Sequence, residues 1–175
     1  YSLTEKKGYL RITASPYTLD ETEAVSFVAR RQTEHDFTAE TWLEFVSSKD
    51  NEEAGVTLIQ NNMHHYDLLL RKQGNKNVIQ LRVRVGSLFY IAAEKELSGN
   101  NVKLKIQGSP FQYAFSYSES ENGQYQELGR LDTRYLSTEV AGGFTGVMIG
   151  LYASSNGKKS NAKAYYAWFD YHELE

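Results

Sequence analysis

Apolar and polar residues alternate strictly in several stretches of this chain. In NVIQLRVRV, residues 77–85, Ile79, Leu81 and Val83 fall on one side, and the intervening Gln80 and Arg82 fall on the other. Because successive side chains of a β-strand point to opposite faces, this period of two predicts a strand with one buried and one solvated face. Sheets built from such strands are typically antiparallel.

The same pattern recurs in NVKLKIQ, residues 101–107, and in FQYAFSYSE, residues 111–119. Further strands are predicted at residues 9–14, 26–32, 37–46, 54–61, 65–72, 88–92, 126–132, 147–153 and 164–173. Turns such as KQGNKN and ESENGQ separate them, and AAEKEL, residues 92–97, is the best helix candidate. About a dozen short strands predict an all-β fold, a β-sandwich of two antiparallel sheets in a single domain over residues 1–175.

The composition excludes several classes of partner. With 19 basic and 22 acidic residues the formal net charge is -3, and no basic patch is present to neutralise phosphates, so no nucleic acid partner is expected. No apolar run approaches the roughly 18 residues of a membrane span, so no membrane partner is expected either. Cys is absent, which excludes disulfides and a nucleophilic thiol. Because the chain starts at Tyr1 rather than Met, we expect it to be a piece of a longer chain. The sequence leaves its compartment open, with the cytoplasm slightly favoured.

No set of residues predicts catalysis. Carboxylates such as Asp50, Glu52 and Glu119 lie in predicted turns, where they are solvated charges rather than the paired acids of glycoside hydrolysis. The chain also lacks a G-x-S-x-G nucleophile motif. We therefore expect no catalytic residue in this chain.

His64 and His65 are candidate metal ligands, with Asp67 two residues beyond. Adjacent residues of a strand face opposite sides, so the two rings cannot easily share one ion. No metal site and no cofactor are therefore expected. A structural Ca²⁺ held by backbone carbonyls and a carboxylate such as Asp170 stays open, because its ligands leave little trace in a sequence.

The hairpin predicted around NNMHHYD, residues 61–67, gathers amide, imidazole and phenol side chains. Sugar hydroxyls need donors, acceptors and a flat apolar face together. Asn61, Asn62, His65 and Tyr66 are therefore a candidate sugar-binding set. The alternative is that Asn61 and Asn62 only shape the turn.

Glycines surround one phenylalanine in EVAGGFTGVMIG, residues 139–150. Gly142 and Gly143 directly precede Phe144, and glycine permits backbone conformations that would present the ring outward. On these residues alone, a core phenylalanine at the start of a strand is the favoured interpretation.

Several stretches together resemble one known module. They are EEAGVTLIQNNMHHYDLLLRK, AFSYSESENGQYQELGRLDT, STEVAGGFTGVMIGLYAS and AYYAWFDYHEL, with YSLTEKKGYLRI and FVARRQTEHDFTAET at the start. Their order and spacing are similar to those of the concanavalin A-like C-terminal domain of glycoside hydrolase family 43 β-xylosidases. The resemblance covers nearly the whole chain. It implies a jelly-roll sandwich that is the non-catalytic domain of a β-xylosidase- or α-arabinofuranosidase-type hydrolase.

The resemblance also implies partners. In this family an N-terminal five-bladed β-propeller of the same chain carries the catalytic carboxylates and acts on xylo- or arabino-oligosaccharides. This segment alone is therefore expected to be inactive. A loop of the C-terminal domain places a phenylalanine at the mouth of the propeller's pocket, and GGFTG matches that loop. The resemblance thus implies that Phe144, with Gly142 and Gly143, closes the substrate pocket.

Two other functions stay open. One is a stand-alone module that binds xylan or another glycan through a solvent-facing aromatic platform. The other is a lectin-like assembly domain without a sugar site. A homo-oligomer is compatible with each of them.

Overall fold

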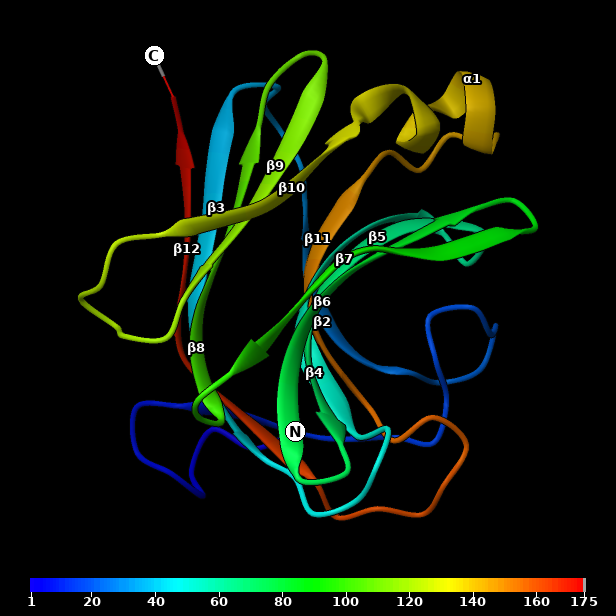
Figure 1. Ribbon diagram of the computed structural model, residues 1–175. Coiled ribbons are helices and arrows are strands. Elements are labelled where there is room, and N and C mark those ends of the chain that lie inside the picture. Colours follow the sequence, from blue (N-terminus) through cyan, green and yellow to red (C-terminus); the bar gives the residue numbers. More distant parts are fainter. Residues whose placement is uncertain (175) are drawn as a thin grey trace.

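The computed structural model describes residues 1–174, in which twelve strands pair into two antiparallel sheets of six strands each (Figure 1). The first sheet has the order β1 (Leu10–Thr13), β12 (Lys163–Glu173), β3 (Phe37–Val46), β8 (Asn101–Gly108), β9 (Gln112–Ser118) and β10 (Gln126–Asp132). The second has the order β2 (Ser26–Arg31), β11 (Met148–Ser154), β4 (Glu53–Asn61), β5 (His64–Gln73), β6 (Lys76–Val85) and β7 (Leu88–Leu97). The predicted all-β sandwich of two antiparallel sheets is confirmed.

The core fills the space between the two sheets. Leu43, Leu104 and Phe115 of the first sheet belong to one buried cluster with Leu58 and Leu68 of the second. Leu104 and Phe115 are apolar members of the alternating stretches, as the period of two predicts. Burying a leucine or phenylalanine side chain contributes about 1.5–3 kcal/mol, so this shared cluster is what joins the two layers.

The prediction that the polar face of β6 is solvated was wrong. Gln80 is 1% exposed and Arg82 is 7% exposed, although both point away from the core. On this outer face Arg82 is held by two acidic side chains, and residues 15–25, here called the strap, pack Leu19 onto the sheet. Ion pairing and a covering segment therefore bury residues that alternation alone assigns to solvent.

Strand pairing corrects one further expectation and shows one irregular strand. The helix candidate at residues 92–97 is the second half of β7, which pairs with β6 as far as Asn77 opposite Leu97. In β12 a register shift between Tyr166 and Phe169 turns the strand, so Phe169 packs against the core as Tyr166 does. A bulge of this kind breaks the period of two.

Short helical turns occur only between β10 and β11 in residues 1–174: the 3₁₀ turn η1 (Thr133–Leu136) and the helix α1 (Thr138–Ala141). Figure 1 shows them at the upper right, beyond the end of β10 and above the β6–β7 hairpin. They lead directly into the glycine-rich segment that carries Phe144.

Candidate functional site: an aromatic loop, an apolar edge and a cleft

Phe144 stands at the apex of a loop formed by residues 142–146 and is fully exposed. Gly142, Gly143 and Gly146 have φ angles of 73°, 76° and 70°, in the left-handed region. A side chain at these positions would be strained, which explains the glycines. No atom lies within 4 Å of where a Cβ of Gly142 or Gly143 would stand, so conformation rather than space requires glycine there.

Both ends of this loop are tied to the end of β4. Asn61 donates a hydrogen bond from Nδ2 to the backbone oxygen of Ala141, at 3.0 Å. On the other side, Thr145 Oγ1 donates to the backbone oxygen of Gln60, at 3.3 Å. The loop is therefore anchored on either side of Phe144, and its ring projects from a fixed base.

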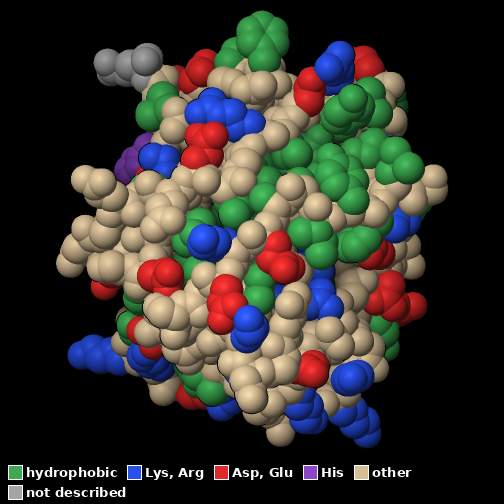
Figure 2. Space-filling view, viewed as in Figure 1, with side chains coloured by type: hydrophobic (Ala, Val, Ile, Leu, Met, Phe, Trp, Pro, Cys, Tyr) green, Lys and Arg blue, Asp and Glu red, His purple; other side chains and the backbone are tan. Residues whose placement is uncertain are grey.

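The start of β7 forms an exposed apolar surface, here called the apolar edge. Leu88, Phe89, Tyr90 and Ile91 are consecutive and each is about half exposed or more, with Leu88 at 66%. β7 is the last strand of its sheet, so these side chains lie at a sheet edge. Figure 2 shows apolar side chains gathered over this side of the molecule. A contiguous exposed patch of this kind marks an interaction site more often than isolated apolar residues do.

The apolar edge and the Phe144 loop lie at the same end of the second sheet. Leu88 pairs with Val85 next to the β6–β7 turn, and Gly86 in that turn donates its backbone N–H to Met63 of the β4–β5 turn. Asn61, which anchors the Phe144 loop, begins this same β4–β5 turn. One end of the molecule therefore presents both exposed apolar features.

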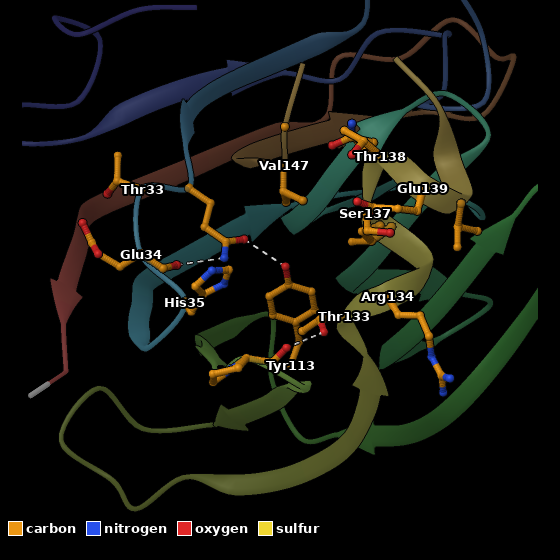
Figure 3. Close-up of a pocket in the computed structure, with 16 residues that line it drawn as sticks. Thr33, Glu34, His35, Tyr113, Thr133, Arg134, Ser137, Thr138, Glu139 and Val147 are labelled. Atoms are coloured by element: carbon orange, nitrogen blue, oxygen red, sulfur yellow. Dashed lines mark hydrogen bonds between the residues drawn. The ribbon is translucent and has the colours of Figure 1, made fainter. Parts of the chain in front are cut away.

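A cleft of about 710 Å³ opens beside the Phe144 loop. Its walls are the β2–β3 connection on one side and the η1–α1 segment on the other, with Tyr113 and Val147 between them (Figure 3). Thr33, Glu34 and His35 line the first wall, and Arg134, Ser137, Thr138 and Glu139 line the second.

The floor of the cleft carries neutral hydrogen-bonding groups. The hydroxyl of Tyr113 donates to Gln32 Oε1 at 2.9 Å, and Gln32 Nε2 donates to the backbone oxygen of Glu34 at 2.8 Å (Figure 3). Burial raises the pKa of Tyr113 to about 12, so its phenol stays neutral. Gln60 also lines the cleft at 6% exposure, and its Oε1 meets no hydrogen-bond partner among residues 1–174.

The four predicted sugar-binding residues do not share one surface. His65 and Tyr66 are buried and lie on opposite faces of β5. Tyr66 points into the core and donates from its hydroxyl to the backbone oxygen of Asp132 at 2.8 Å, beside η1. Asn62 donates to the backbone oxygen of Asp20 in the strap, at 3.2 Å. This geometry gives the hairpin a scaffolding role and does not support the sugar-binding hypothesis there.

His65 is the centre of a buried charge cluster under the strap. Its Nδ1 lies 2.9 Å from Asp67 Oδ1 and its Nε2 lies 3.1 Å from Asp20 Oδ1. Burial opposes protonation of the ring, but the two carboxylates outweigh it and raise the pKa of His65 to about 9. The imidazolium holds the pKa of Asp67 below its ordinary value even though burial acts the other way.

The same cluster continues to Glu53, which is fully buried. Arg82 donates to both of its carboxylate oxygens, at 2.9 and 2.8 Å, and Arg71 donates to it at 3.1 Å. Arg82 also lies 3.4 Å from Asp67. Sequence reasoning missed this cluster because it placed Glu53 in a solvated turn before the strand at residues 54–61 and placed Arg82 on a solvated strand face, whereas both are buried.

Residues 1–174 contain no group of three or more His, Cys, Asp or Glu side chains arranged to hold a metal ion. Asp170, the carboxylate considered for calcium, is exposed on β12. In the described part of the chain, no helix is long and apolar enough to cross a membrane.

Comparison with known proteins decides the family. Residues 1–172 match the family described as the β-xylosidase C-terminal concanavalin A-like domain of the GH43 glycosidases. The chain belongs to this family. The concanavalin A-like fold implied by the resemblance is thereby confirmed.

Relatives of this GH43 C-terminal domain are longer proteins. The chain is 35% identical over 176 residues to the non-reducing end α-L-arabinofuranosidase BoGH43B of Bacteroides ovatus, covering 100% of this chain and 33% of that protein. It is 34% identical to a xylosidase/arabinosidase of Butyrivibrio fibrisolvens, covering 99% of this chain and 34% of that protein. The solved structure described as Bacteroides ovatus Xyloglucan PUL GH43B superposes with a TM-score of 0.93 at 35% identity, over 99% of this chain and 34% of that one. The chain therefore spans about a third of the length of these relatives.

Proposed function

We propose that this chain is the non-catalytic domain of a GH43 glycosidase that hydrolyses xylose- or arabinose-containing oligosaccharides. It docks onto the catalytic domain through the apolar edge and places Phe144 at the substrate pocket. The observation that carries the proposal is the exposed ring of Phe144 on a loop anchored at both ends by Asn61 and Gln60. An exposed aromatic ring on a fixed base is suited to contact a partner or its ligand.

The relatives support a catalytic domain as the partner that covers the apolar edge. They are about three times as long as this chain and are described as an arabinofuranosidase and a xylosidase/arabinosidase. A five-bladed propeller preceding this domain, as the family resemblance implies, would supply the acid and base. The apolar residues 88–91 lie at the same end as Phe144, so one contact would both bury the apolar edge and position the ring.

The ring would act on the reaction by shaping the pocket. An apolar wall excludes water and limits the pocket to short substrates, which favours removal of terminal sugar units. Because Phe144 would contact the substrate only after docking, its removal should affect turnover and leave the fold of this domain intact.

Phe144→Ala in the longer protein tests this role. We expect kcat/KM on xylobiose or an arabinoside to fall by about tenfold or more, equivalent to about 1.4 kcal/mol of transition-state stabilisation. Phe111→Ala is the matched control, because Phe111 is also a strongly exposed phenylalanine in a turn. An equal kcat/KM for the two variants would contradict the proposal.

A further inference from the structure

The cleft beside the Phe144 loop is a separate feature from the exposed ring itself. It lies between the β2–β3 connection and the η1–α1 segment, and its volume of about 710 Å³ is within the roughly 300–1,000 Å³ of small-ligand sites. Neither the apolar edge nor Phe144 lines it. Docking of a catalytic domain through those features therefore does not by itself assign the cleft a role.

Gln60 is the strongest indication that the cleft is a ligand-binding site. Its side chain is more than nine-tenths buried, and its Oε1 has no hydrogen-bond partner in residues 1–174. Its Nε2 reaches only Thr145 Oγ1, at 3.4 Å. A buried amide oxygen without a partner has lost its hydrogen bond to water and gained none in return, so a donor supplied by a ligand in the cleft would restore that bond.

The other groups of the cleft narrow the chemistry of the ligand. Tyr113 places a neutral phenol at the floor, and Val147 and Leu136 add apolar surface. Arg134 is already paired with Asp132, at 2.5 Å, so it is not a free cation that would select a phosphate or carboxylate. Neutral donors and acceptors next to apolar surface are what a sugar ring requires.

We propose that this cleft binds one or two sugar units of a neutral pentose oligosaccharide, with Gln60 Oε1 accepting a hydrogen bond from a sugar hydroxyl. The site belongs to the non-catalytic domain itself and goes beyond the docking role of Phe144. It would hold a chain or product near the catalytic domain without taking part in bond cleavage. A failure of this proposal leaves the docking proposal untouched, because this one is tested by sugar binding at the side-chain oxygen of Gln60 and the other by turnover without the ring of Phe144.

The test is a ¹H–¹⁵N NMR titration of this chain, whose core and both sheets are formed within residues 1–174. Xylobiose and α-1,5-arabinobiose are the probes. With at least one of these sugars we expect saturable chemical-shift changes that give a Kd of about 1 mM. The affected amides should be those of residues 32–35, 133–140 and 145–147. No saturable shift with either sugar up to tens of millimolar, or shifts confined to other segments, would overturn the proposal.

Two variants locate the site. Gln60→Leu is expected to weaken binding by about tenfold, the effect of losing one hydrogen bond in a buried site. The matched control is Gln80→Leu, since Gln80 is also buried with an unpartnered Oε1 in the described residues but lies on the outer face of β6, away from the cleft. Thr138→Trp, an exposed position on the wall, should block the cleft without touching the core. Unchanged binding in Gln60→Leu, or in Thr138→Trp if Gln60→Leu does not fold, would contradict the proposal.

Discussion

Two regions of the second sheet differ in how completely this chain covers them. Under the strap, the charges of Glu53, Asp67 and Arg82 are buried and paired with one another. At the β6–β7 end, the apolar edge and Phe144 are exposed, with nothing in residues 1–174 covering them. The first region therefore takes its stability from within the chain. The second leaves apolar surface for a partner, and the contrast separates residues that hold the fold from residues that serve the function.

The largest expected effect comes from breaking the covered region. Glu53→Ala would leave Arg82 buried without its bidentate partner, so we expect the free energy of unfolding to fall by about 3–5 kcal/mol in urea denaturation. Lys76→Ala is the control, because it removes an ion pair to Glu96 that is exposed on both sides and should leave the unfolding midpoint unchanged. If Glu53→Ala lowers the free energy of unfolding no more than Lys76→Ala does, the buried charge cluster does not stabilise the sheet.

A second effect is the pH dependence of the same region. Because the folded-state pKa of His65 is raised to about 9 from 6.5, its contribution is fully present below pH 6.5 and is lost as the pH rises through 9. Asp20 and Asp67 have lowered pKa values and stay ionised in this window, and the raised pKa of Arg82 keeps its guanidinium charged beside Asp67. Arg84 lies 3.8 Å from Asp20. The loss is up to about 3 kcal/mol of unfolding free energy.

Urea denaturation between pH 6 and pH 9.5 measures this loss. His65→Gln should flatten the decline, because the glutamine does not titrate in that range. A wild-type chain whose stability is constant across the window would show that folding does not raise the pKa of His65. A variant that declines as steeply as the wild type would assign the decline to other groups.

The smallest effect on stability is expected at the uncovered end. Leu88→Lys combined with Tyr90→Lys replaces two exposed residues at the edge of the sheet, so the free energy of unfolding of this chain should change by no more than about 0.5 kcal/mol per substitution. The same pair should loosen docking in the longer protein, measured as faster proteolysis between the two domains. A loss of more than about 2 kcal/mol in this chain alone would place these side chains in its own core instead.

The alternation of residues predicted the strands because burial on one face is a local property of each segment. It predicted Ile79 and Leu81 correctly as core. It failed at Gln80 and Arg82 because their burial depends on Glu94 of β7 and Glu53 of β4, which are other strands of the same sheet. Such partners are distant in sequence, so no window of residues reveals them. The helix expected at residues 92–97 failed for a related reason, since pairing with β6 overrides local preference.

The candidate site was only partly predictable. Glycines before Phe144 indicate an unusual backbone, but only the family resemblance assigned the ring a role. Gln60 and Tyr113 were not singled out as binding residues, because the cleft forms where β4, β9 and the η1–α1 segment meet in space. Asn61 was chosen for its chemistry, and the structure shows it anchoring the loop that carries Phe144.

The most direct test of the contrast between the two regions is hydrogen exchange, measured on this chain alone and within the longer protein. We expect backbone amides of residues 88–91 and 142–146 to exchange more slowly in the longer protein, because docking covers the apolar edge and the Phe144 loop. Amides of residues 64–68, in the charge cluster, should exchange equally in both. Equal exchange at residues 88–91 and 142–146 in the two proteins would show that no docked domain covers the apolar edge and the Phe144 loop.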